Sequence, residues 1–132
     1  MPATAYWRNL INDAAVGGTA FQGPSTVYLA LVTDVPTPTT AGTEIDDTAY
    51  ARSEVNMGTA FTDDGAGTRT SNADIAWPEA DADYSADIEA VEAYDAATDG
   101  NRLWYEPLPA PVTFVAGDIP QFDAGELTFN VV

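Results

Sequence analysis

The chain lacks three of the residue types that carry most protein chemistry, because its 132 residues include no cysteine, no histidine and no lysine. Without cysteine there is no disulfide, thiolate metal site or sulfur nucleophile, and without histidine the commonest neutral metal ligand and acid–base group is missing. Only carboxylates and tyrosines are left for proton transfer at neutral pH. We therefore expect no catalytic residue, no bound cofactor and no enzyme activity.

Positive charge is also scarce, since Arg8, Arg52, Arg69 and Arg102 are the only basic residues against 21 acidic ones. A surface that binds phosphates needs clustered lysine or arginine to displace counterions, and these four are scattered singly along the chain. The sequence therefore predicts no nucleic-acid partner.

The net charge of -17 and the pI near 4.1 indicate the surface of a halophilic protein, in which aspartate, glutamate, threonine and alanine replace lysine. At low ionic strength such a surface repels itself, whereas molar salt shortens the Debye length to about 3 Å and removes most of that cost. We expect salt to stabilise the fold. An acidic protein of an ordinary environment is the alternative.

Long apolar runs are absent too, since no stretch approaches the roughly 18 apolar residues of a membrane span. The first residues, MPATAYWR, lack the basic region and apolar run of a signal peptide. We expect synthesis in the cytoplasm and no contact with a membrane. The length and the hydrophobic content of 45% suit one folded domain that spans residues 1–132.

One short helix is predicted near the start of the chain. Apolar residues follow helical spacing between about residues 4 and 16, with Thr4 as a candidate N-cap and Gly17-Gly18 as a stop. The apolar residues Trp7, Leu10 and Ile11 of this segment are candidates either for the core or for docking onto a partner.

Everything after Gly18 reads as short strands between turns rich in Gly, Pro, Thr and Asp, and we expect seven or eight strands. The clearest segments are 26–33, 50–57, 72–77, 88–94, 102–108 and 126–131.

The pattern within these segments predicts several details. The segment 26–33 is apolar on both faces, as in a central strand, and we expect it under the helix. The polar residues of 88–94 are predicted to face solvent, and the prolines at 107, 109 and 111 to bound a loop. Leu127, Phe129 and Val131 alternate with polar residues, so they should point into the core.

The absence of strand–helix–strand alternation indicates a mainly β protein, an antiparallel β-sandwich of jelly-roll type with a short N-terminal α-helix.

Several acidic groups could bind Ca²⁺ through carboxylate oxygens, although none has the spacing of an EF-hand loop. The candidates are Asp46 and Asp47, Asp63 and Asp64, and the group Glu79, Asp81 and Asp83. Plain solvated charge is the alternative for all of them. A pair of carboxylates could also catalyse glycoside hydrolysis, but among 21 acidic residues such pairs arise by chance and do not indicate an active site. Arg52, inside a predicted strand, is expected to form an ion pair that stabilises the fold, with an interface contact as the alternative.

The order of short motifs along the chain resembles that of small β-sandwich proteins of tailed viruses, often labelled tail fibre or minor head proteins. The likeness spans almost the whole chain and rests on Leu10, GGTAF at 17–21, Pro24, TVYLAL at 26–31, PT at 36–37, GTE at 42–44, YAR at 50–52, SN at 71–72, WP at 77–78, DAA at 95–97, Gly100, LWY at 103–105, GD at 117–118 and AGEL at 124–127.

The resemblance implies a structural protein of the virion without catalytic residues, and the acidity adds a virus of a halophilic archaeon. We expect a capsid decoration or turret subunit on the head, assembled as a homo-oligomer against the major capsid protein. The alternatives are a tail or tail-fibre protein that contacts other tail proteins, and a module that binds host glycans through aromatic residues in end loops.

Overall fold

The computed structural model describes residues 1–20 and 22–130. Phe21, part of one motif that carries the resemblance, and Val131, predicted to face the core, lie outside the described residues. Within the described part, the chain forms one helix and nine strands, and every strand pair is antiparallel. The mainly β class is confirmed, with slightly more strands than expected.

Helix α1 runs from Ala5 to Ala15, inside the predicted range. Thr4 is its N-cap, as predicted, because its hydroxyl accepts a hydrogen bond of 3.2 Å from the amide of Trp7 in the first turn. The same hydroxyl donates to the carbonyl of Arg102 at 2.8 Å, so the cap also ties the helix to the sheet. After the helix, Gly18 has a φ of +71°, which a glycine adopts without strain.

The larger sheet has four strands in the order β2-β1-β6-β7. Strands β1 (Thr26–Val32) and β6 (Ile88–Tyr94) lie in the centre, and β2 (Ser53–Asn56) and β7 (Arg102–Val112) form the edges. The central position predicted for the first strand is confirmed, since most of its residues are buried on both faces.

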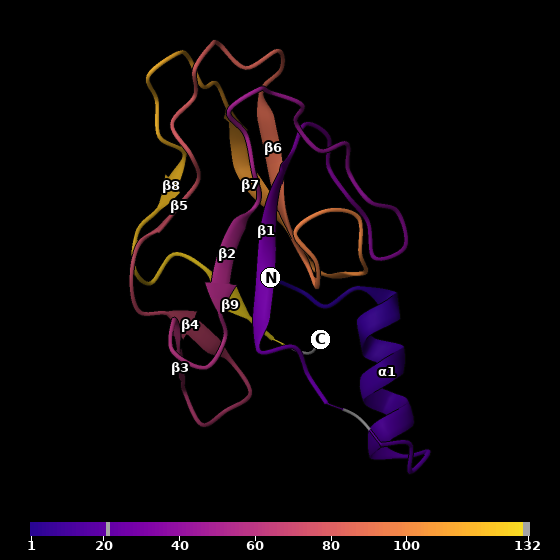
Figure 1. The fold of residues 1–132 in the computed structure, drawn as a ribbon. Coiled ribbons are helices and arrows are strands. Elements are labelled where there is room, and N and C mark those ends of the chain that lie inside the picture. The colour runs from indigo at the N-terminus through magenta and orange to yellow at the C-terminus, as the bar shows by residue number, and fades with distance from the viewer. Residues whose placement is uncertain (21, 131–132) are drawn as a thin grey trace.

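The second layer consists of five very short strands in two small sheets. One contains β3 (Phe61–Asp63), β4 (Arg69–Ser71) and β9 (Thr128–Phe129), and the other pairs β5 (Ile75–Ala76) with β8 (Gln121–Phe122). In Figure 1 these strands lie beside and below the larger sheet, while α1 lies on its other side. The predicted antiparallel sandwich is therefore confirmed.

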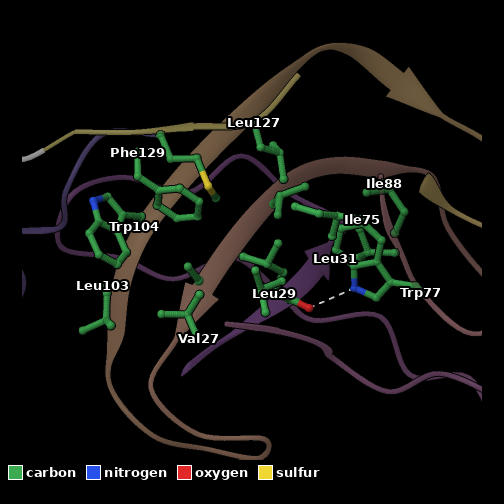
Figure 2. Close-up of a cluster of buried hydrophobic side chains, with 14 of the residues drawn as sticks. Val27, Leu29, Leu31, Ile75, Trp77, Ile88, Leu103, Trp104, Leu127 and Phe129 are labelled. Atoms are coloured by element: carbon green, nitrogen blue, oxygen red, sulfur yellow. Dashed lines mark hydrogen bonds between the residues drawn. The ribbon is translucent and has the colours of Figure 1, made fainter. Parts of the chain in front are cut away.

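The core fills the space between the two layers. Val27, Leu29 and Leu31 alternate along β1 and meet Leu127 and Phe129 of the second layer (Figure 2). Burial of each such aliphatic side chain contributes about 1.5–3 kcal/mol. The indole N–H of Trp77 donates to the carbonyl of Leu29 at 2.9 Å, which pins the second layer to the centre of the sheet. The core positions predicted for Leu127 and Phe129 are confirmed.

Strand β7 corrects one prediction, because it continues to Val112 through all three prolines that were expected to bound a loop. The amide of Tyr105 points away from β6 and donates to the carbonyl of Pro2 at 3.2 Å. Backbone amides alternate in direction along a strand, so Pro107, two residues after Tyr105, lacks a donor only on the outer side. Pro109 and Pro111 lie between Pro107 and Val112, where the register with β6 shifts and no residue pair is formed. The strand therefore accommodates its prolines on the outer side or where the pairing with β6 is interrupted, and they blunt an exposed edge.

The position of the helix corrects a second prediction. It packs chiefly against β7, where Trp7 meets Trp104 edge to face at 5.3 Å between ring centroids, and not over β1. The reason lies in the segment before the helix, because Ala3 pairs with Trp104 and the amide of Thr4 donates to the carbonyl of Leu103 at 2.8 Å. This pairing delivers the helix to the β7 edge of the sheet.

Candidate assembly interface

The helix residues proposed for docking or core occupy intermediate positions. The ring of Trp7 is only 6% exposed and belongs to the core, whereas Leu10 and Ile11 are half-buried and pack against it. Trp7 and Ile11 also line a groove of about 660 Å³ together with Met57, Trp104 and other residues. All three residues therefore contribute to the core or pack against it, and a docking role for them stays a prediction.

A buried ion pair holds the two long strands of the sheet together. Glu92 of β6 was predicted to face solvent, but its side chain is wholly buried, and its Oε2 lies 2.7 Å from Nη1 of Arg102 in β7. The amide of Gly42 and the hydroxyl of Tyr94 also donate to this carboxylate. Burial raises the pKa of Glu92 above its ordinary value, although Gly42 and Arg102 oppose this.

A second ion pair lies beside the first. Arg52 contacts Glu44 through Nε and Nη2 at 2.9–3.3 Å, and its Nη1 donates to the carbonyls of Ala96 and Asp99 at 2.8 Å. The ion pair predicted for Arg52 is confirmed. Its guanidinium also lies 4.0 Å from the centre of the Tyr94 ring.

Two tyrosines complete this network. The hydroxyl of Tyr50 donates to Glu44 at 2.6 Å and accepts from the amide of Leu31, and burial raises its pKa well above the ordinary range. Burial, helped by the charge of Glu92, raises the pKa of Tyr94 to about 12. Both tyrosines therefore stay neutral at physiological pH, and the network works as scaffold.

An apolar surface lies at the far end of β7 and in the loop that follows it. Val112, Val115 and Ile119 are 40%, 47% and 55% exposed, and they lie within eight residues of one another. Val112 and Ile119 line a hollow of about 240 Å³ whose lining contains no charged residue, and Val115 follows Phe114, another lining residue. We call this surface the apolar end. Its lining consists of Leu31, Trp77, Ile88, Leu108, Val112, Phe114, Ile119, Pro120, Gln121 and Phe122.

Carboxylates surround the apolar end and fix its backbone. The hydroxyl of Thr113 donates to Asp87 at 2.8 Å, the amide of Ala116 to Asp83 at 3.0 Å, and the amide of Val115 to Asp118 at 2.9 Å. These hydrogen bonds order the loop, so its valine and isoleucine side chains are held outward in a defined arrangement. The apolar end therefore has an acidic rim and no arginine among its lining residues.

Sequence reasoning missed this surface. Leu108 to Phe122 reads as proline-punctuated loop and strand, and nothing in the local pattern distinguishes an exposed valine from a buried one. The available signal was the density of large apolar residues, Val112, Phe114, Val115 and Ile119, in a segment predicted to be mostly loop.

Most of the carboxylates proposed to bind Ca²⁺ instead form hydrogen bonds or an ion pair within the protein, and the others are exposed. Asp63 pairs with Arg69 and accepts from Gly65, and Asp64 accepts from Ala66 and Thr68. Hydrogen bonding of these amides lowers the pKa of Asp64.

The other candidates lie nearer the apolar end. Asp47 accepts from Ala49, Asp81 accepts from Thr48, and Asp83 belongs to the acidic rim, whereas Asp46 and Glu79 are simply exposed. Hydrogen bonding by the Thr48 hydroxyl, followed by the influence of Asp47, lowers the pKa of Asp81. Within residues 1–20 and 22–130, no group of three or more acidic side chains is arranged to hold a metal ion.

Comparison with known families gives the affiliation. A family model described as "Podophage GP4 fiber I protein gp80" matches residues 2–130. The chain belongs to this fibre protein family. A comparison with curated proteins found no match.

Membership in the fibre family supports the predicted role as a structural protein of a tailed virus, associated with other components of the virion. It agrees with a non-enzymatic protein. It also favours the tail-fibre alternative over the capsid decoration or turret subunit that the sequence first suggested. No helix in the described part of the chain is long and apolar enough to cross a membrane.

Proposed function

We propose that the chain is a subunit of a tail fibre, joined to a neighbouring protein of the virion through the apolar end. The match of the fibre family model to residues 2–130 carries the proposal, because it covers the whole described sandwich apart from Met1. The decoration and turret hypotheses have no comparable support.

The closed edges of the larger sheet argue for docking through side chains. The outer side of β7 is occupied by residues 2–4 along its first half, and the second half of the strand lacks amide donors at Pro107, Pro109 and Pro111. The opposite edge, β2, has only four residues and bonds through Ser53 Oγ to the carbonyl of Ala76 at 2.9 Å. Addition of a partner strand is therefore disfavoured at both edges.

The apolar end fits a partner of opposite charge. Exposed apolar side chains surrounded by polar residues are typical of protein–protein contacts. The rim formed by Asp83, Asp87 and Asp118 would repel the same rim of a second copy, but would attract lysine or arginine of another protein. We infer that the occupant is a different virion protein with an apolar contact surface and a basic rim.

The experiment compares Ile119→Asp and Val115→Asp with the control Val16→Asp in virions that carry the variant gene. Val16 is 81% exposed just after α1, away from the apolar end. We expect the two test variants to fold but to be depleted from purified particles at least about tenfold, because a charge in an apolar contact opposes docking. The control should be incorporated normally. Normal incorporation of Ile119→Asp and Val115→Asp would contradict the proposed contact.

Self-association is a separate question. The homo-oligomer expected from the sequence stays a prediction, which sedimentation of the purified chain in molar salt tests directly. A dimer abolished by Ile119→Asp would assign the apolar end to a second copy, and would overturn the basic partner.

A further inference from the structure

The structure has a further surface hollow, which shares no lining residue with the apolar end and which the proposed fibre role does not use. It lies where the start of α1 meets the loop that contains Pro38 and the turn at Asp99 and Gly100 between β6 and β7. Its volume is about 660 Å³, within the range of small-ligand sites. We call it the polar hollow. Its lining consists of Thr4, Ala5, Tyr6, Pro38, Thr39, Ala41, Arg52, Tyr94, Asp99, Gly100, Asn101 and Arg102.

The walls of the polar hollow are rigid. Arg52 and Arg102 are fixed by Glu44 and Glu92, and Arg102 also donates to the carbonyl of Thr37 at 2.6 Å. The amide of Ala5 donates to the carbonyl of Pro38 at 3.0 Å, which joins the helix to the loop across the hollow. A ligand would therefore meet groups that are already in place, and binding would cost little ordering.

Tyr6 gives the polar hollow an unusual feature. It is 43% exposed, and it is the only aromatic residue in the exposed class among residues 1–20 and 22–130. An exposed aromatic ring beside hydrogen-bonding groups suits a ligand that has both an apolar face and hydroxyl groups. The hydroxyl groups of Tyr6 and Thr39 and the carboxylate of Asp99 make no hydrogen bond with other described residues, so they are available.

The charge of the polar hollow selects among such ligands. Each of its two arginines is compensated by a glutamate, and most donors of Arg52 are already engaged. Asp99 adds a negative charge, and the lining holds no further basic residue. An acidic ligand would therefore meet net repulsion, whereas an uncharged ligand would not.

We propose that the polar hollow binds a neutral sugar, with the ring of Tyr6 against its apolar face and Thr39 and Asp99 bonded to its hydroxyl groups. This proposal names the ligand class for the glycan-binding role considered from the sequence, and it puts the aromatic contact on the helix. It does not depend on docking through the apolar end.

The test is saturation-transfer NMR of the purified chain with glucose, galactose, mannose, N-acetylglucosamine and glucuronate. Sugar concentrations of about 10 mM reveal dissociation constants in the millimolar range. We expect at least one neutral sugar to bind and glucuronate to bind more weakly. Tyr6→Ala should weaken binding about tenfold, while Tyr6→Phe, which keeps the ring, should weaken it less. Val16→Ala, at an exposed position just after α1 that does not line the hollow, is the control.

Three results would overturn the proposal. They are the absence of saturation transfer from the protein to any of the four neutral sugars, an unchanged affinity in Tyr6→Ala, and tighter binding of glucuronate than of its neutral counterpart glucose. None of these bears on the fibre role, because incorporation into particles is measured with variants at the other surface. Circular dichroism of Tyr6→Ala establishes that its fold is intact.

Discussion

Arg102 of β7 and Glu92 of β6 form an ion pair of 2.7 Å, in which the glutamate side chain is wholly buried and the arginine is 9% exposed. Because the pair is formed across the two strands that lead into the turn at Asp99 and Gly100, it fixes one wall of the polar hollow. In a chain with only four basic residues, two of them are used for this scaffold.

Removal of one member of this pair should be costly. We expect Arg102→Met to lower the free energy of unfolding at pH 7 by about 3–5 kcal/mol, because it leaves the carboxylate of Glu92 buried without its counter-charge. The double variant Glu92→Met with Arg102→Met should recover most of the loss. Urea unfolding measures both. A single variant as stable as the double variant would contradict a buried, charged Glu92.

The tyrosines of the network predict a late alkaline transition. The folded state raises the pKa of Tyr94 to about 12 from the ordinary value of 10.0, so it favours the neutral phenol. The corresponding stability is complete below pH 10 and is lost as pH rises from about 10 toward 12, where the unfolded chain deprotonates first.

Absorbance at 295 nm measures this titration. Tyr94→Phe should remove one late-titrating group and flatten the loss of stability between pH 10 and 12. If the titration curve of Tyr94→Phe instead lacks a tyrosine that titrates near the ordinary pKa of 10, Tyr94 is not buried in the network.

Substitution within α1 separates packing from docking. We expect Trp7→Ala to lower the free energy of unfolding by about 3–5 kcal/mol, because it empties a core position against Trp104. Leu10 and Ile11 are half-buried, so Leu10→Ala and Ile11→Ala should each lower the free energy of unfolding by only about 1 kcal/mol. Chemical denaturation of the three variants provides the comparison. Native-like stability of Trp7→Ala would assign this ring to an interface instead of the core.

The acidic surface predicts stabilisation by salt. Three of the four arginines are already paired with acids, so most of the acidic charge is uncompensated. The melting temperature should rise between low and molar potassium chloride, because screening weakens the mutual repulsion. Replacement of Asp81, Asp83 and Asp87 by Asn should reduce the dependence on salt. A melting temperature that does not rise with salt would contradict the halophilic interpretation.

The sequence predicted those parts of the fold that depend on local chemistry. Thr4 caps the helix because a hydroxyl before an apolar period is a local signal, and β1 is central because TVYLALV is apolar on both faces. The short strands β3, β4 and β8 were not predicted, since two or three residues carry little periodicity and are held in place by pairing with distant segments.

The errors have the same origin. Pro107, Pro109 and Pro111 looked like a loop because proline is excluded from central strands, and only the sheet order shows that β7 is an edge. Glu92 shares strand parity with Ile88 and Ala90, which are buried, but a charged residue is expected to face solvent unless its partner is known. That partner, Arg102, follows ten residues later across a hairpin.

The same limit applies to the surfaces. The exposure of Val112, Val115 and Ile119 depends on which elements cover the end of β7, and no local pattern encodes that. The polar hollow joins Tyr6, Thr39 and Asp99 from three distant segments of the chain. The sequence therefore predicted the elements more readily than the surfaces on which distant segments meet.

The location of the chain in an intact particle tests the central claim most directly. A cryo-electron microscopy reconstruction of the virion, with the sandwich fitted to its density, should place the chain in a fibre attached to the tail, with Ile119 and Val115 facing a basic surface of another virion protein. Many copies distributed over the head shell, with the apolar end open to solvent, would contradict the account and restore the capsid decoration hypothesis.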